Sequence, residues 1–234
     1  MSSTDSRVAV LVPAAGCGER MGGQRKQFRL LDGETLLLRT VRVFDRHPGI
    51  HHIVVAAPPE EAEGLPSYLR AAGISKLHRV VPGGRSRQES VAAALDAVPS
   101  GVDLVLVHDG VRPFVPADRI DAIIEAIRTY GAAALAVPVS DTLRKSIDSV
   151  FGETVSRDGL YRMQTPQGFR LEWFLEAHHA AKEERFEETD DVALVQRLGR
   201  SVHIVEGSPA NMKVTTPDDW ELAQALWRHL STET

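Results

Sequence analysis

A loop of small residues that carries two cations gives this chain its strongest chemical signal. Residues 12–21 read Val-Pro-Ala-Ala-Gly-Cys-Gly-Glu-Arg-Met and follow an apolar run at 8–12. Small residues let the backbone turn tightly and bring its N–H groups against an anion. Arg20 and Lys26 add two positive charges to the same segment. This combination predicts a binding site for a triphosphate, and the alternative is a tight strand-to-helix turn with surface charges.

Two other nucleotide-binding loops do not match this segment. A dinucleotide fingerprint requires Gly-x-Gly-x-x-Gly, and its third glycine position is occupied by Met21. It also requires an acid at the end of the second strand, but the run at 52–57 leads into Ala-Ala-Pro-Pro. A P-loop requires Gly-Lys-Ser/Thr after a four-residue gap, which this segment lacks. Nucleotidyl transfer therefore remains, whereas hydride transfer and P-loop hydrolysis are excluded.

A second cluster, Gly-Gly-Arg-Ser-Arg-Gln-Glu-Ser at 83–90, follows the third apolar run. Its glycines expose backbone N–H and C=O groups that can read the edge of a base. Ser90 adds a hydroxyl that can donate or accept a hydrogen bond. An ordinary glycine turn at the start of a helix is the alternative interpretation.

A third cluster begins where the apolar run 103–108 ends in Asp109. A carboxylate at this place can hold Mg²⁺, which takes one or two carboxylates together with phosphate oxygens. Arg112 can contact a phosphate or a polar substrate in bidentate fashion. The alternative for Asp109 is a helix cap. His108 is interpreted as a hydrogen-bonded structural histidine, because attack by a phosphate group needs no base.

Hydroxyls and cations also occur far along the chain, as a phosphorylated substrate would require. Each has a simpler alternative, such as a helix cap for Thr189 or a solvated strand end for Lys213. These candidate residues are Thr142, Arg157, Thr165, Thr189 and Lys213.

Composition limits the class of protein. The chain has 234 residues, 43% of them hydrophobic and 25% charged, which suits one large α/β domain spanning 1–234. The net charge of −5 argues against nucleic acid as the main partner. No apolar run reaches the ~18 residues that a membrane span requires. Cys17 is the single cysteine, so no internal disulfide can form, and we expect a cytoplasmic protein.

Strand-like and helix-like segments alternate along the chain. The pattern predicts strands at 8–12, 53–57, 77–81, 103–108, 132–138 and 202–205. It predicts helices at 35–46, 59–72, 86–98, 116–130, 171–185, 191–198 and 217–230. Such alternation indicates a mostly parallel, doubly wound sheet with helices on both faces. Ligands of such sheets bind at the carboxyl ends of the strands, where the strand order reverses.

Residues 140–163 interrupt this alternation. They mix polar and apolar residues, contain two glycines and show no helical stripe. We interpret them as an extended β-arm, a subdomain that leaves the domain. Because such an arm cannot bury both its faces on its own domain, the sequence predicts a two-fold homodimer in which arms cross between subunits.

Seven short motifs follow one another along the chain. They are Pro-Ala-Ala-Gly, Gly-Gly-Arg-Ser-Arg-Gln-Glu-Ser-Val, Val-His-Asp, Asp-Thr, Thr-Pro-Gln, Thr-Asp-Asp and Lys-Val-Thr. From about residue 8 to 227 the chain resembles the 2-C-methyl-D-erythritol 4-phosphate cytidylyltransferase family. The resemblance implies a Rossmann-like nucleotidyltransferase domain that transfers CMP from CTP to the methylerythritol phosphate with Mg²⁺ and releases pyrophosphate. The alternatives are a ribitol 5-phosphate cytidylyltransferase and a nucleotide-binding module without turnover.

The resemblance also implies roles for single residues. Arg20 and Lys26 would stabilise the α-phosphate, and Asp109 would meet the metal or the substrate hydroxyls. The triphosphate would lie on Ala14, Ala15, Gly16 and Gly18. Cytosine would be read by Gly84, the backbone of Arg85 and Ser90, with Gly110 near the ribose. The polyol phosphate would be bound by Arg112, and by Thr142 and Arg157 from the partner's arm. Thr165, Thr189 and Lys213 would complete its pocket or orient phosphates, with Lys213 joining Arg20 and Lys26 as a catalytic residue.

Three positions depart from the family pattern. Arg25 stands where a proline often precedes the loop lysine, and Gly110 stands where alanine is frequent. Arg85 replaces an acidic or small residue. The first two bear on the rigidity of the loops, and the third has little effect where only the backbone reads the base.

Overall fold

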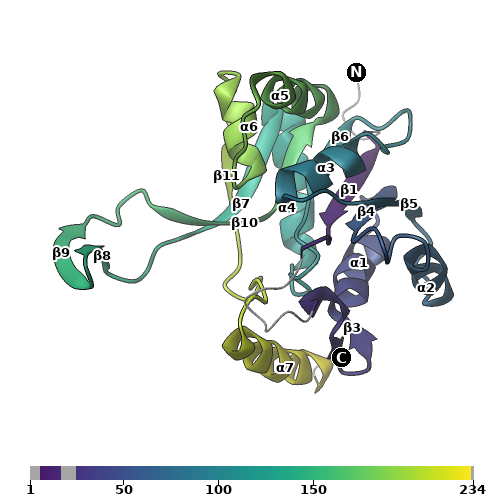
Figure 1. Ribbon diagram of the computed structural model, residues 1–234, viewed down its shortest axis with the longest axis horizontal. Coiled ribbons are helices and arrows are strands. Elements are labelled where there is room, and N and C mark those ends of the chain that lie inside the picture. The colour runs from purple at the N-terminus through teal and green to yellow at the C-terminus, as the bar shows by residue number, and fades with distance from the viewer. Residues whose placement is uncertain (1–5, 17–24, 233–234) are drawn as a thin grey trace.

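The computed structural model describes residues 6–16 and 25–232 and contains a seven-stranded sheet with the order β11-β7-β10-β6-β1-β4-β5 (Figure 1). The strands of this sheet are β1 (Val8–Pro13), β4 (His52–Ala57), β5 (Leu77–Pro82), β6 (Leu104–Val107), β7 (Ala132–Pro138), β10 (Tyr161–Arg170) and β11 (His203–Glu206). The helices are α1 (Leu36–Arg46), α2 (Leu65–Ala71), α3 (Arg87–Leu95), α4 (Ala117–Tyr130), α5 (Leu171–Glu184), α6 (Asp191–Arg197) and α7 (Pro217–Thr232). Smaller elements are the 3-10 turn η2 (Lys26–Phe28), the strand pair β2 (Leu30–Leu31) and β3 (Glu34–Thr35), and the pair β8 (Leu143–Ile147) and β9 (Val150–Val155).

The sheet is mostly parallel, as the sequence predicts. Only β10 runs antiparallel, to β6 on one side and to β7 on the other. The sequence analysis missed this strand because the predicted arm ends at 163 and its continuation carries a proline. A register shift between Met163 and Gln167 surrounds that proline and breaks the alternating pattern.

Both faces of the sheet are buried, which explains its continuous apolar strands. Along β1, Val8, Val10 and Val12 pack with α1, α2 and α4, whereas Ala9 and Leu11 pack with α3, α5 and α6. This two-residue alternation distributes one strand between two hydrophobic cores. A third, smaller core lies between α7 and the β2–β3 pair and includes Leu31, Val214 and Trp220.

The strand order reverses beside β1. The chain builds β4 and β5 on one side of β1 and then returns to place β6 on its other side. Connections that leave β1 and β6 in opposite directions open a crevice at the carboxyl ends of these two strands. The opening loop and Asp109 come directly after these two strands, where the sequence predicts a site.

One predicted helix is much shorter than expected. The pattern at 59–72 predicts a helix, but α2 begins only at Leu65. The preceding residues form turns in which the N–H groups of Glu61 and Ala62 donate to Pro58 O. Gly64 is the N-cap of α2, and Glu60, in the turns before it, forms an exposed ion pair with Arg25.

The predicted arm is present as a separate hairpin of β8 and β9. Figure 1 shows it extending to the left, away from the body of the molecule. Asp148 and Ser149 form its tight turn in the left-handed region, and Ile147, Val150 and Phe151 are exposed beside the turn. An isolated two-stranded hairpin is marginal in water, so these apolar side chains agree with the predicted crossing to a partner, which stays a prediction.

The helices of the described part of the chain are all too short or too polar to cross a membrane.

The stability of the fold depends on pH through His178 on α5, because the ring of this histidine is buried. This ring packs edge-on against Phe174, with 4.5 Å between the ring centroids. Burial, and to a smaller extent the charge of Arg87, lowers the pKa of His178 from 6.5 to about 4. The unfolded chain therefore takes up a proton at a higher pH than the folded chain does. Stability is fully present above about pH 6.5 and falls as the pH drops toward about 4.

We expect His178→Leu to flatten this pH dependence. Between about pH 7 and about pH 4 the wild type should lose about 3 kcal/mol more unfolding free energy than the variant. Denaturant unfolding at several pH values measures this difference. His179→Leu, at an exposed position on the same helix, is the matched control and should behave like the wild type. Parallel profiles for His178→Leu and wild type would contradict the prediction.

Candidate active site

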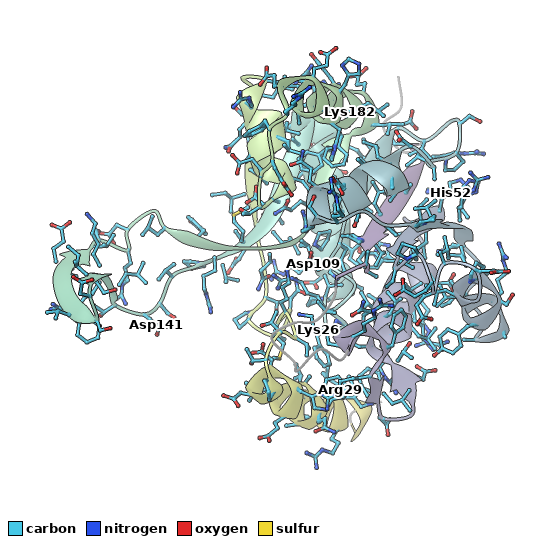
Figure 2. All side chains as sticks on the ribbon, viewed as in Figure 1. Lys26, Arg29, His52, Asp109, Asp141 and Lys182 are labelled. Atoms are coloured by element: carbon cyan, nitrogen blue, oxygen red, sulfur yellow. The ribbon has the colours of Figure 1, made fainter. Side chains whose placement is uncertain are left out.

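A cleft of about 460 Å³ lies at the carboxyl ends of β1 and β6. It joins segments that are far apart in the sequence, including the opening loop, the 83–90 cluster, Asp109 and the 207–216 segment between β11 and α7. Figure 2 shows Lys26 and Asp109 in the body of the molecule and Asp141 far out on the arm. The described residues that line the cleft are Pro13, Ala14, Ala15, Gly16, Lys26, Gln27, Gly84, Arg85, Ser86, Arg87, Ser90, Asp109, Val111, Lys213 and Thr215.

Asp109 is a buried carboxylate surrounded by three cations. Its Oδ1 lies 3.2 Å from Nε of Arg87. Its Oδ2 lies 3.3 Å from Nε of Arg112 and 3.0 Å from Nζ of Lys213. Burial by itself raises the pKa of the Asp109 carboxyl, but Arg87, Lys213 and Arg112 together hold that pKa well below its usual value. Asp109 is therefore ionised near neutral pH.

A second buried carboxylate, Asp191, holds the other side of Arg87. Nη1 of Arg87 donates to Asp191 Oδ2 at 2.7 Å, and Asp191 is only 1% exposed. Burial raises the pKa of Asp191, and the charge of Arg87 opposes this shift. Gln167 on β10 accepts a hydrogen bond from the Asp191 backbone N–H. The three cations and two carboxylates leave the cluster with one net positive charge, which favours an anionic ligand.

Lys213 reaches Asp109 because the 207–216 segment is fixed at several points. The N–H of Val214 donates to Val111 O at 3.0 Å, and Nη1 of Arg112 donates to Asn211 O at 2.8 Å. The side-chain amide of Asn211 donates in turn to Thr165 O. Lys213 is the most exposed of the three cations around Asp109, with 38% of its side chain accessible, so it can meet a ligand in the cleft.

A chain of hydrogen bonds behind Asp109 fixes its backbone. The Asp109 N–H donates to Thr165 Oγ1, which contacts Nδ1 of His108 at 3.2 Å. Nε2 of His108 lies 2.9 Å from Arg112 O, and since a carbonyl only accepts, Nε2 carries the proton. Burial lowers the pKa of His108 to about 4, so its ring is neutral near pH 7. These contacts agree with the interpretation of His108 as a structural histidine.

The 83–90 cluster forms the start of α3, and its N–H groups are already used. Gly84 N donates to Ser90 Oγ, and Arg85 N donates to Glu89 Oε2. Ser90 Oγ donates to Ser86 O at 2.9 Å. The sequence predicts that the glycines of this turn expose N–H and C=O groups to the edge of a base. The N–H groups of Gly83 and Gly84 are instead used within the protein, and base reading by the carbonyl groups stays a prediction. A Cβ on Gly84 would lie 2.2 Å from Glu89 Cβ, so this close approach requires glycine.

The opening loop is described only up to Gly16. The predicted site residues Gly18 and Arg20 lie outside the described residues. Ala14, Ala15 and Gly16 line the cleft. Gly110 packs closely behind them, because a Cβ at this position would lie 3.1 Å from Leu37 Cδ1 and 3.2 Å from Ala14 Cβ. An alanine here would require these neighbours to shift by a few tenths of an ångström.

The described residues do not fit a metal held by the protein alone. Asp109 is the only acidic side chain among the described cleft-lining residues. Both its oxygens already contact cations. Within the described ranges, no group of three or more His, Cys, Asp or Glu residues could hold a metal. A Mg²⁺ ion at this site would therefore need most of its ligands from bound phosphates and water.

Several other predicted site residues lie away from the described cleft lining. Arg112 and Thr165 are buried behind Asp109, where they fix it in place. Thr189 is exposed just before α6, and the side chain that caps this helix is Asp190 rather than Thr189. Thr142 and Arg157 are exposed on the arm. They do not reach the described cleft of their own chain.

The structure adds three residues that the sequence analysis did not assign, namely Gln27, Arg87 and Asp191. Arg87 and Asp191 stand inside the Gly-Gly-Arg-Ser-Arg and Thr-Asp-Asp motifs, but no local signal pairs two residues 104 positions apart. Gln27 comes directly after Lys26, and its role depends on carbonyl groups earlier in the loop.

Comparison with known proteins gives a consistent result. A family model described as 2-C-methyl-D-erythritol 4-phosphate cytidylyltransferase matches residues 8–229. A curated relative of that name from Salinibacter ruber is 56% identical over 220 residues, 94% of this chain and 92% of the relative. The crystal structure of a protein of that name from Thermus thermophilus is similar, with a TM-score of 0.79 and 37% identity, over 95% of this chain and 99% of the other. A 4-diphosphocytidyl-2C-methyl-D-erythritol synthase from Anaerococcus prevotii has a TM-score of 0.82 at 27% identity, with coverage of 95% and 99%.

The bridge from Arg87 to Asp191 should be strongly coupled in stability. Arg87→Met leaves Asp191 as an uncompensated buried charge, so we expect it to cost about 3 kcal/mol or more. Asp191→Asn leaves Arg87 paired with Asp109 and should cost less. The double variant should cost clearly less than the sum, since neither charge remains. Denaturant unfolding of all four proteins measures this coupling.

The matched control is the cycle Arg197→Met with Glu184→Gln. This pair is half exposed, and its coupling should stay below about 1 kcal/mol. Additive costs at Arg87 and Asp191 would show that the bridge is not a coupled unit.

Proposed function

The chain belongs to the 2-C-methyl-D-erythritol 4-phosphate cytidylyltransferase family, and on this basis we propose how its cleft carries out the reaction. The reaction transfers CMP from CTP to 2-C-methyl-D-erythritol 4-phosphate and releases pyrophosphate, in the non-mevalonate route to isoprenoids. The observation that supports our assignment of the site is the set of cations around Asp109 at the point where the strand order reverses.

The chemical step needs positioned positive charge rather than a base. A phosphate oxygen of the polyol substrate attacks the α-phosphorus of CTP and forms a new P–O bond. The bond from the α-phosphorus to the oxygen bridging to the β-phosphorus breaks, and both electrons leave with pyrophosphate. Negative charge spreads over the equatorial oxygens in the transition state. We assign its stabilisation to Lys26, Lys213 and Arg20, because fixed cations act without reorganising.

CTP would lie with its phosphates on the opening loop and its base against the start of α3. Ala14, Ala15, Gly16 and Gly18 would approach the triphosphate closely because they carry no bulky side chains. The N–H groups of Gly84 and Arg85 are used inside the turn. The carbonyl oxygens of this turn would therefore read the base, by accepting hydrogen bonds from the cytosine amino group. Ser90 would fix the turn, and Gly110 would leave space near the ribose.

Asp109 would act mainly as the counter-ion that holds Lys213 and Arg87 in position. Mg²⁺ is then best regarded as part of the substrate, entering as its complex with CTP. This interpretation rests on the donor set, in which a single carboxylate is already paired with three cations.

The polyol phosphate would be bound between two subunits. Thr189 would contribute from the chain that holds CTP, and Thr142 and Arg157 from the partner's arm. Arg112 and Thr165 would support this site from behind Asp109, where their polar atoms are already used. The exposed positions of Thr142 and Arg157, outside the described lining of their own cleft, support this arrangement. The exposed apolar tip of the arm supports a homodimer. We place the reaction in the cytoplasm, as expected from the single cysteine.

Replacing Lys26 should impair the chemical step. Lys26→Ala should lower kcat for pyrophosphate release by about 10²-fold or more, by analogy with loss of one charge-stabilising donor. The KM for the methylerythritol phosphate should change less. Arg25→Ala is the matched control, because Arg25 is a neighbouring cation that pairs with Glu60 and Glu61, and it should keep a near-normal kcat. A near-normal kcat for Lys26→Ala would refute the assignment.

Mixed dimers should reveal whether the arm serves the partner's site. Homodimers of Lys26→Ala and of Arg157→Ala should each be nearly inactive. After joint unfolding and refolding, half the dimers are mixed, and each has one site with both lesions and one site with none. Activity should then recover to roughly a quarter of the wild-type value. No recovery despite confirmed subunit mixing would mean that Arg157 acts within its own chain.

A further inference from the structure

Gln27 ties the beginning of the opening loop to its end. This side chain comes directly after Lys26 in η2 and is 3% exposed. Its amide Nε2 donates to Ala14 O at 2.7 Å and to Gly16 O at 3.0 Å. An amide nitrogen has two N–H donors, so both donors of this side chain are used on the backbone of the loop.

These two hydrogen bonds determine which way the peptide units of the loop face. In a trans peptide the C=O and the following N–H lie in one plane and point in opposite directions. The unit that turns Ala14 O toward Gln27 therefore turns the N–H of Ala15 away from it, and the carbonyl of Gly16 is also turned toward Gln27. The N–H of Ala14 itself is used by Ala56 O on β4. The loop leaves the sheet at Ala14, and Gln27 orients the peptide units beyond that point.

We propose that Gln27 is a positioning residue for the triphosphate of CTP. Its amide orients the loop carbonyls inward so that the loop N–H groups face the phosphate oxygens, and it fixes the place of the adjacent Lys26. This inference rests on the proposed function, since it concerns how the same cleft binds CTP. Gln27 acts through the loop and not by contact with the reacting atoms.

The chemistry of the site accounts for the choice of glutamine. An ionised glutamate of the same shape has no donor and would place a negative charge against two carbonyl oxygens and near a triphosphate. A methionine of similar length fills the space but leaves both carbonyls without a donor. Because the site is buried, water cannot fully replace the lost donors.

The experiment compares Gln27→Met and Gln27→Glu with wild type by equilibrium binding of CTP and by steady-state kinetics with each substrate varied. We expect Gln27→Met to weaken CTP binding and to raise the KM for CTP by about 10-fold, with a larger effect for Gln27→Glu. The KM for the methylerythritol phosphate should change by less than about 3-fold. This split between the two substrates is the readout that a merely structural glutamine would not produce.

Asp45→Ala is the matched control. Asp45 on α1 is a partly buried side chain that accepts hydrogen bonds from the backbone N–H groups of Ser75 and Lys76, outside the described cleft lining. The variant should lower the melting temperature without changing the KM for CTP. Affinity for CTP within about twofold of wild type in Gln27→Met would overturn the proposal, and so would equal changes of the KM values for both substrates in that variant. Failure of wild type itself to release pyrophosphate would instead overturn the proposed function, while direct CTP binding still tests Gln27.

Discussion

A single buried carboxylate organises this active site. Asp109 lies at the end of β6, and an ionised group so far removed from water is stable only when cations surround it. The three cations that do so come from the start of α3, from the turn after β6 and from the 207–216 segment. Satisfying one charge therefore fixes three separate segments. The same constraint holds Lys213 in place before any substrate arrives, which is the preorganisation that phosphoryl chemistry requires.

The surroundings of Asp109 separate a rigid interior from a reactive cleft. Behind the carboxylate, His108 and Thr165 form a neutral hydrogen-bond chain that fixes its backbone. In front of it, Lys213 remains partly exposed to the cleft. Arg87 shares its charge with Asp191, so the cluster stays only slightly positive without a ligand. This charge balance supports our proposal that the triphosphate brings its own Mg²⁺, so that the protein does not have to supply a second carboxylate.

Sequence alone predicted the sheet and most positions of the cleft, because both depend on local signals. Apolar runs mark the strands, and Gly84, Gly110 and Asp109 come directly after them. The features that it missed depend on contacts between distant segments. The strand β10 was hidden by its proline and register shift, and the pairing of Arg87 with Asp191 spans 104 positions. The start of α2 was misplaced because the residues before Gly64 form turns around Pro58 instead of a continuous helix.

The central claim is that Asp109 positions the surrounding cations as their counter-ion. The most direct test is to measure the turnover of the Asp109→Asn variant over a range of Mg²⁺ concentrations. The amide keeps the shape of the side chain, removes its charge and replaces one acceptor oxygen by an N–H donor. If Asp109 acts as the counter-ion that positions the cations, kcat should fall by about 10-fold or more at every Mg²⁺ concentration, while the half-saturating Mg²⁺ concentration stays at the wild-type value. A half-saturation point displaced to much higher Mg²⁺, with kcat recovering at saturation, would show that Asp109 is a metal ligand and would contradict this account.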